Sequence, residues 1–138
     1  MDDCVFCKIA AGKIPSYIIH EDDEFMVILD RFPATAGHTL VLVKRHAESI
    51  YEIYKDEGRK LFELVSATAG ALKNALKFDG LNVLQNNGKA AGQSVGHFHI
   101  HLLPRYEGDS VKIAFPQKNP PADEFINMVS ILREAFDK

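Results

Sequence analysis

The chain has little cysteine, no excess of positive charge and no long hydrophobic run. Its 16 Lys and Arg residues are outnumbered by 19 Asp and Glu, so the formal net charge is −3. This balance gives no electrostatic reason to expect binding to nucleic acid or to an anionic membrane. The longest apolar stretches, such as residues 40–43, are far too short to span a bilayer. With 46% hydrophobic and 25% charged residues, the composition predicts a soluble globular protein.

The sequence also indicates neither a structural disulfide nor an export signal. The two cysteines, Cys4 and Cys7, are so close in sequence that a disulfide between them would close only a trivial loop. The start Met1-Asp2-Asp3 is acidic, opposite in charge to the first segment of a secretory signal, so we expect a cytoplasmic protein. There are no repeats or low-complexity tracts, and a length of 138 residues predicts one domain over 1–138.

Hydrophobic spacing predicts an α+β fold built on an antiparallel sheet. The expected strands are 16–20, 25–30, 38–43, 81–85 and a histidine-rich strand that Pro104 ends. A long helix is expected between an N-cap at Asp56 and a stop at Gly80. A C-terminal helix at about 121–136 follows two prolines and carries its apolar residues on one side: Phe125, Met128, Val129, Leu132 and Phe136.

The run from His97 to His101 alternates histidine with apolar residues. In an extended strand the three imidazoles leave one face, with neighbours roughly 7 Å apart and the outer two about 13 Å apart. That spread is too wide for one metal ion bound through His–metal bonds of about 2.1 Å. The run therefore predicts a row of separate proton-handling or nucleophilic groups.

Electrostatics limits the charge of such a row. Two imidazolium ions about 7 Å apart at an effective dielectric near 20 repel by about 2 kcal/mol, so we expect a mixture of neutral and protonated rings. A neutral ring can attack an electrophile, and a charged neighbour can stabilise negative charge; phosphorus is the natural electrophile. The preceding loop, 86–96, supports this because Gly88, Gly92 and Gly96 permit turned backbone that can cradle an anion.

The stretch 92–103, Gly-Gln-Ser-Val-Gly-His-Phe-His-Ile-His-Leu-Leu, resembles the signature of the histidine triad (HIT) superfamily of nucleotide hydrolases and transferases. The similarity is greatest to the Hint-like bacterial branch and covers about residues 4–105. It extends to Val5-Phe6-Cys7-Lys8-Ile9, Ile14-Pro15, Asp30, 37–43 and 81–86. Gly96 stands where related proteins often carry a larger side chain, and we expect it to loosen the turn or widen the pocket.

The resemblance implies a role for each matching position. His99 would attack the α-phosphorus of a nucleotide and form a nucleotidyl-histidine, and His101 would hydrogen-bond the phosphate. Because the transferase branch has glutamine in place of the third histidine, His101 implies a hydrolase. His38 would join the histidine cluster and Asp30 would bind the ribose. The remaining positions are Asn86, Gln93 and Ser94 for phosphate or leaving group, and Phe6, Ile9, Ile14 and Leu40 near the base.

Three functions stay open. The resemblance favours hydrolysis of nucleoside 5′-monophosphate derivatives, such as phosphoramidates and acyl adenylates of AMP. The alternatives are cleavage of dinucleoside polyphosphates and a nucleotide-binding partner module with incidental activity. A homodimer without nucleic-acid or membrane partners is also implied.

The pair Cys4 and Cys7 is a C-x-x-C motif, with His46 about forty residues further on. Two thiolates and two imidazoles would make a closed tetrahedral zinc site. His46 is the natural third ligand, and in several bacterial-type relatives the first triad histidine, here His97, is the fourth. For the cysteines, the alternatives are a reduced pair without metal and a redox pair. For the whole protein, the alternative is a structural protein held together by zinc. No organic cofactor is expected.

Overall fold

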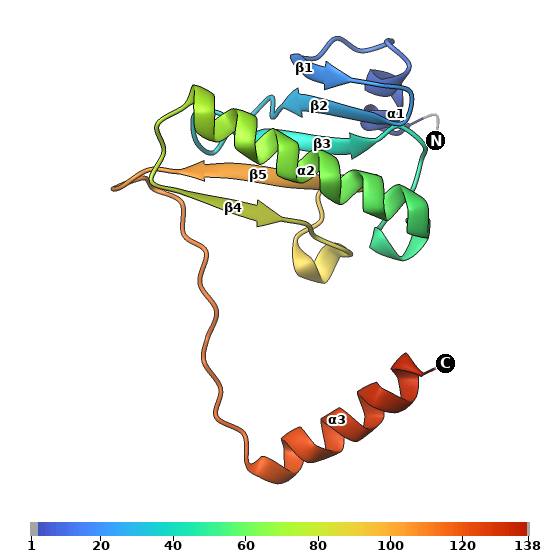
Figure 1. Cartoon of the computed structure of the whole chain (residues 1–138), viewed down its shortest axis with the longest axis vertical. Helices are drawn as coiled ribbons and strands as arrows, with labels where there is room; N and C mark the ends of the chain where they lie inside the picture. Colours follow the sequence, from blue (N-terminus) through green and yellow to red (C-terminus); the bar gives the residue numbers. More distant parts are fainter. Residues whose placement is uncertain (1–2, 138) are drawn as a thin grey trace.

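The computed structural model describes residues 3–137 and has the α+β fold that the sequence predicts. Among these residues, five strands form one antiparallel sheet in the order β1-β2-β3-β5-β4 (Figure 1). The remaining two residues of the acidic start, Met1 and Asp2, lie outside the described part. The strands are β1 (Ile18–Glu21), β2 (Phe25–Leu29), β3 (Thr39–Val43), β4 (Gly80–Leu84) and β5 (His99–Arg105). The helices are α1 (Val5–Ala10), α2 (Lys55–Ala75) and α3 (Ala122–Phe136), with single 3₁₀ turns at Ile50–Glu52 and Lys89–Ala91.

The central strands are buried on both faces, which explains why β2 and β3 are apolar almost throughout. Val27 and Val41 belong to the core cluster under α2, whereas Ile28 and Leu40 belong to the cluster under α1. The register pairs Leu40 with His101, and Leu42 with His99. Both histidines therefore lie on the α1 side of the sheet.

Helix α2 covers the opposite face of the sheet. Its buried residues Leu61, Val65, Thr68 and Leu72 recur at the spacing that predicted the helix. The predicted ends are wrong by a few residues. Helix α2 starts at Lys55 because Tyr54 occupies the cap position and its N–H donates to Glu57 Oε1 at 3.2 Å. It ends at Ala75 because Leu76 is extended, and the predicted stop, Gly80, instead opens β4.

Two expectations for the histidine strand are wrong. His97 lies in a bend before β5, which begins at His99, so only two of the three histidines stand on the strand. Pro104 does not end β5; it pairs with Leu81, and the strand continues to Arg105. The Pro104 carbonyl accepts a hydrogen bond from Thr35 Oγ1 at 2.6 Å, beyond the last β3 pairing at Leu102. No β3 residue pairs with Pro104, so its missing N–H breaks no hydrogen bond of the sheet on that side. Proline is tolerated at such a position in a sheet.

Helix α1 has no counterpart in the sequence analysis. It is only six residues long, and Cys4 caps it by accepting a hydrogen bond from the Cys7 N–H at an Sγ–N distance of 3.3 Å. Phe6 and Ile9 bury the inner side of the helix against the sheet. The same two cysteines therefore shape the N-terminal segment and lie against His46 and His97.

The expected C-terminal helix forms as α3, but it stands apart from the sheet at the end of an extended segment (Figure 1). Every described residue from 121 to 137 is exposed. The interpretation of 1–138 as one HIT-like domain stays a prediction. None of the helices formed by residues 3–137 is both long enough and apolar enough to cross a membrane.

Gly37 is expected to be the least replaceable glycine near the site. It precedes His38 with a φ of +88°, and a methyl group there would lie 2.5 Å from Leu76 Cδ1. We expect Gly37→Ala to lower the free energy of unfolding by roughly 1–3 kcal/mol, measured by urea denaturation. Gly12→Ala is the control, because Gly12 has a φ of +75° but no atom within 4 Å of the added methyl. Equal losses in the two variants would show that the contact with Leu76 contributes nothing.

Candidate active site

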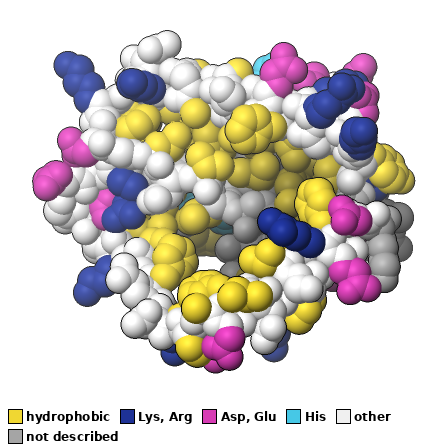
Figure 2. All heavy atoms as spheres, turned by 60° about the horizontal axis from the view of Figure 1, so that its bottom comes forward, with side chains coloured by type: hydrophobic (Ala, Val, Ile, Leu, Met, Phe, Trp, Pro, Cys, Tyr) yellow, Lys and Arg dark blue, Asp and Glu magenta, His cyan; other side chains and the backbone are white. Residues whose placement is uncertain are grey.

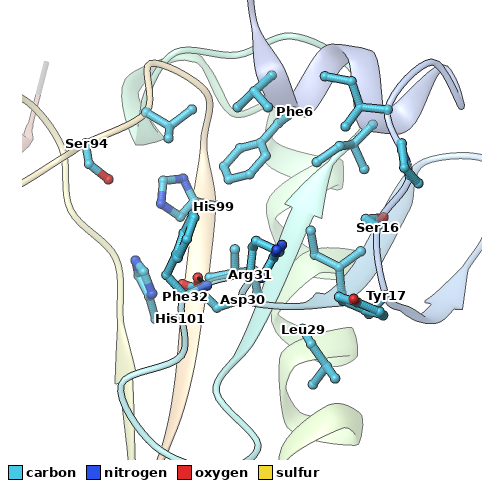
Figure 3. Close-up of a pocket in the computed structure, with 17 residues that line it drawn as sticks. Phe6, Ser16, Tyr17, Leu29, Asp30, Arg31, Phe32, Ser94, His99 and His101 are labelled. Carbon is cyan, nitrogen blue, oxygen red and sulfur yellow. Dashed lines mark hydrogen bonds between the residues drawn. The ribbon is translucent and has the colours of Figure 1, made fainter.

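A cavity of about 790 Å³ opens between α1, the sheet and the loop before β5, a size typical of small-molecule sites. Most of its wall is apolar, and the predicted polar residues in it gather around His99 and His101 (Figure 3). His38, Asn86 and Gln93 do not line it. The predicted residues that do are Phe6, Ile9, Ile14, Asp30, Leu40, Ser94, His99 and His101.

His99 is buried and its tautomer is fixed by the backbone. Its Nδ1 lies 2.7 Å from the carbonyl oxygen of His97. Because a carbonyl only accepts, Nδ1 carries the proton, and a neutral ring keeps a free lone pair on Nε2. The edge of Phe6 packs against this ring, with 5.0 Å between ring centroids. His99 is therefore held in the cavity wall as a neutral ring with an unprotonated Nε2.

His38 fixes the tautomer of His101 in the same way. The Ala34 N–H donates to His38 Nδ1 at 3.1 Å, so the His38 proton lies on Nε2. That Nε2 is 2.9 Å from His101 Nδ1 and 3.5 Å from Asp30 Oδ2. Donation to His101 Nδ1 leaves the His101 proton on Nε2. The site thus presents a lone pair on His99 beside an N–H donor on His101, with ring centroids 5.0 Å apart.

Burial decides the charge of these rings. It lowers the pKa of His99 and of His38, against an opposing effect of Asp30. For His101, burial together with the neighbouring His99 and His38 lowers the pKa to about 4. Burial also lowers the pKa of His97. The rings are neutral at pH 7, so the expected mixture of neutral and protonated histidines is wrong: desolvation outweighs the nearby carboxylate.

Only two of the three glycines in the loop before β5 have the turned backbone conformation that the sequence predicts. Gly88 and Gly92 have φ values of +86° and +90°, as a turned loop requires. Gly96 has no positive φ, and a methyl group there would meet nothing within 4 Å. The backbone conformation therefore does not require glycine at position 96.

Three polar residues of this loop, Asn86, Gln93 and Ser94, were predicted to contact the phosphate or the leaving group, but only Ser94 lines the cavity. Ser94 is exposed and lines the cavity on the His99 side (Figure 3). Gln93 instead holds the loop: its Nε2 donates to the carbonyls of Glu48 and Val95, and its Oε1 accepts from the Gly88 N–H. Contacts of Gln93 and Asn86 with a substrate stay predictions.

Sequence reasoning missed several residues of the cavity wall. Ser16, Tyr17, Arg31 and Phe32 line the cavity, and Figure 3 shows Ser16 and Tyr17 on the side away from Ser94. The hydroxyl oxygen of Ser16 is shielded from solvent and has no hydrogen-bond partner among the described residues. A buried hydroxyl without a partner is unusual, and rotation about its Cα–Cβ bond would offer it to a ligand. Only the adjacency of Ser16 to the quoted Ile14-Pro15 could have drawn attention to it.

Next to the cavity, the predicted metal ligands come together. One ligand atom from each of Cys4, Cys7, His46 and His97 lies within 4.8 Å of the others. Cys4 Sγ is 3.2 Å from His97 Nδ1, and Cys7 Sγ is 3.2 Å from His46 Nδ1. His97 Nε2 lies 2.6 Å from the Val43 carbonyl and so carries the proton, which leaves Nδ1 free to bind a cation. Two sulfurs and two imidazole nitrogens at these distances fit a tetrahedral metal site.

A second cluster, Asp30, His38 and His101, also brings three ligand atoms within 4.8 Å. It is unsuited to a cation, because His38 Nδ1 already accepts the Ala34 N–H and its Nε2 therefore holds a proton instead of a free lone pair. This cluster serves hydrogen bonding.

His97 belongs to both sites at once. Its fully buried ring lies in the Cys/His cluster, and its carbonyl orients His99. The neighbouring Phe98 N–H donates to the Ala47 carbonyl at 2.7 Å, which fixes the bend from the other side. A displacement of His97 in the cluster would therefore also move the carbonyl that orients His99.

Several known proteins are similar to this chain in sequence and in fold. The HIT domain family model matches residues 11–108. An uncharacterised HIT-like protein of Methanocaldococcus jannaschii is 42% identical over 127 residues, which are 91% of this chain and 98% of that protein. An adenylylsulfatase of Arabidopsis thaliana is 40% identical over 108 residues, which are 78% of this chain and 55% of that protein.

Solved structures are similar over almost the whole chain. A Streptococcus mutans protein superposes with a TM-score of 0.94 at 40% identity, covering 99% of this chain and 87% of that one. A histidine triad nucleotide-binding protein of Candida albicans gives 0.88 at 31% identity, covering 98% of both chains. A zinc-bound histidine triad family protein of Mycobacterium smegmatis gives 0.75 at 34% identity, covering 99% and 96%.

Proposed function

Because this chain belongs to the HIT domain family, we propose that it is a nucleotide-binding hydrolase that cleaves the bond between the α-phosphate of a nucleoside 5′-monophosphate and its leaving group. The observation that carries the proposal is the pair of complementary tautomers: a lone pair on His99 Nε2 beside a proton on His101 Nε2. Phosphoryl transfer requires little more than an aligned nucleophile and donors for the phosphate charge.

In the proposed reaction, His99 Nε2 attacks the α-phosphorus. A nitrogen–phosphorus bond forms as the bond to the leaving group breaks, and water then displaces His99 from the nucleotidyl-histidine. His101 Nε2–H donates to a phosphate oxygen, and His38 holds His101 in the tautomer that can donate. Ser94 lies on the same side of the cavity and supplies a hydroxyl to the phosphate or leaving group.

The rest of the cavity suits the nucleoside. Asp30 is placed to accept hydrogen bonds from the ribose hydroxyls, and the apolar wall formed by Phe6, Ile9, Ile14 and Leu40 suits a flat base. The Ser16 hydroxyl, on the wall opposite Ser94, would hydrogen-bond the edge of that base.

For the leaving group, we propose an amine or a carboxylate, as in phosphoramidates and acyl adenylates of AMP. Steady-state kinetics test this directly: kcat/KM for adenosine phosphoramidate is expected to exceed that for diadenosine polyphosphate by roughly tenfold or more. The support is the Gln93-Ser94 pair before the triad, which is typical of the branch that acts on such substrates. A higher kcat/KM for the dinucleotide would make the protein a dinucleoside polyphosphate hydrolase instead.

We further propose that Cys4, Cys7, His46 and His97 hold a structural zinc ion. The support is the fit of their donor atoms and the zinc-bound relative from Mycobacterium smegmatis. Zinc there would brace α1 against the bend at His97 without taking part in the chemistry. We also propose a cytoplasmic location and a homodimeric state, in keeping with the sequence expectations.

A further inference from the structure

Arg31 brings a positive charge to the cavity that the proposed reaction does not use. Its guanidinium lies over the Phe32 ring, with Cζ 5.4 Å from the ring centroid, and both residues line the cavity. Arg45 and Arg105 each pair with a carboxylate, whereas Arg31 has no ion pair among residues 3–137. Of the described residues in the cavity wall, Arg31 is the one that is positively charged at pH 7, because burial keeps the histidines neutral.

The position of Arg31 in the cavity places it beside the base of a bound nucleotide. In the view of Figure 3, Arg31 lies between the histidines on one side of the cavity and Ser16 on the other. The proposed function puts the phosphate at His99 and an edge of the base at the Ser16 hydroxyl. The base between these two points therefore comes within reach of the Arg31 guanidinium.

The guanidinium and the Ser16 hydroxyl differ in what they can recognise. Arg has five N–H donors and no acceptor, whereas a hydroxyl both donates and accepts. Guanine presents two acceptors, O6 and N7, on one edge, but adenine presents N7 beside a donating amino group. Arg can bind the guanine edge through two parallel hydrogen bonds, while at adenine one of its N–H groups would face another donor. Arg31 can thus distinguish the two purines, and Ser16 can serve either.

We propose that Arg31 makes the cavity selective for guanine, so that derivatives of GMP are better substrates than derivatives of AMP. The inference rests on the proposed function, because it assumes a nucleoside 5′-monophosphate with its phosphate at His99. The contact with the Phe32 ring is close enough for a cation–π interaction, which holds the guanidinium at the cavity before a ligand arrives. AMP still binds through the apolar wall, the ribose and Ser16, but it lacks the second acceptor.

A general attraction of Arg31 for phosphate is the competing role. An exposed charge is screened by water and salt, so this role would add little affinity. The surroundings do not strengthen it, because the formal net charge of the chain is −3. Figure 2 shows Lys and Arg side chains scattered over one face of the molecule and interspersed with Asp and Glu. The two roles also predict different results, since attraction for phosphate would be the same for every base.

Calorimetric titration with GMP, AMP and IMP tests the preference. GMP is expected to bind about tenfold more tightly than AMP, at the low end for a bidentate contact between Arg and guanine because Arg31 is exposed. IMP keeps O6 and N7 but lacks the 2-amino group, so it is expected to bind like GMP. Equal affinities for GMP and AMP, or an affinity for IMP as low as that for AMP, would overturn the proposal.

Variants separate the shape of the guanidinium from its charge. Arg31→Met and Arg31→Lys are both expected to abolish the tenfold difference by weakening GMP alone, because lysine keeps the charge but lacks the planar fork. Ser16→Ala is expected to weaken GMP and AMP equally. The matched control is Arg59→Met: Arg59 lies on α2, does not line the cavity and pairs with Asp56, so both affinities are expected to stay unchanged. An equal loss for GMP and AMP in Arg31→Met, or a full preference for GMP in Arg31→Lys, would contradict selection by the fork.

Kinetics distinguish a failure of this inference from a failure of the proposed function. The kcat/KM for guanosine phosphoramidate is expected to exceed that for adenosine phosphoramidate by about tenfold. Equal and measurable values would remove the guanine preference and leave the hydrolysis intact. No turnover of either compound, with GMP still bound more tightly than AMP, would remove the hydrolysis and leave the preference for guanine intact.

Discussion

Replacing His99 by alanine is expected to lower kcat by roughly 10⁴-fold while changing the affinity for AMP only a few-fold. The large loss follows because no other ring has an unprotonated nitrogen in the same position: His101 and His38 hydrogen-bond each other, and His97 turns into the Cys/His cluster. AMP affinity is expected to survive, because the apolar wall and Asp30 are untouched. The measurements are single-turnover kinetics and calorimetric titration with AMP.

His20→Ala is the matched control for that variant. His20 lies on β1 with an exposed ring paired to Asp22, and it does not line the cavity. Its removal is expected to leave both kcat and AMP affinity at wild-type values. Comparable rates in the wild type and the His99→Ala variant would remove His99 from the mechanism and favour a binding module.

Loss of the metal is expected to have the second largest effect. His46→Gln should reduce bound zinc from about one equivalent per chain to under roughly 0.2, and lower the melting temperature by about 10 °C. Burial, together with the hydrogen bond to Cys4, raises the pKa of Cys7 to about 11 in the absence of a cation. Without a bound cation, therefore, the Cys7 thiol keeps its proton, and α1 loses the metal-mediated part of its link to His97.

The variant should also reveal the coupling between the two sites. Since the His97 carbonyl orients His99, the loss of metal is expected to lower kcat more than it weakens AMP binding. His20→Gln also removes one imidazole, but outside the cluster, and is expected to change neither metal content nor melting temperature. Wild-type protein with less than about 0.2 equivalents of zinc, and with no change in melting temperature after chelation, would contradict the zinc proposal.

Residue spacing was sufficient to predict the parts of the site that lie on regular strands. Alternation along the predicted histidine strand placed His99 and His101 on one face, and their pairing with Leu42 and Leu40 of β3 confirms that arrangement. The four candidate metal ligands were also identified from sequence motifs and resemblance, and the fold brings them together. In both cases the prediction depended on residues close together in the sequence or on a specific motif.

Features that depend on long-range contacts could not be predicted. His97 leaves the strand because the carbonyls of Val43 and Ala47 capture its ring and the next N–H, and alternation in sequence contains no sign of those partners. The neutral state of the rings follows from burial, which the sequence does not give. Ser16 lies in the cavity wall only because the N-terminal segment folds over the sheet.

The proposed nucleophilic role of His99 is tested most directly by trapping the covalent intermediate. Protein mixed with adenosine phosphoramidate and quenched without acid is to be digested and analysed by mass spectrometry. The expected result is one nucleoside monophosphate group attached to the peptide that contains His99, and none in the His99→Ala variant. Turnover without such an adduct, or an adduct on a different residue, would contradict the mechanism.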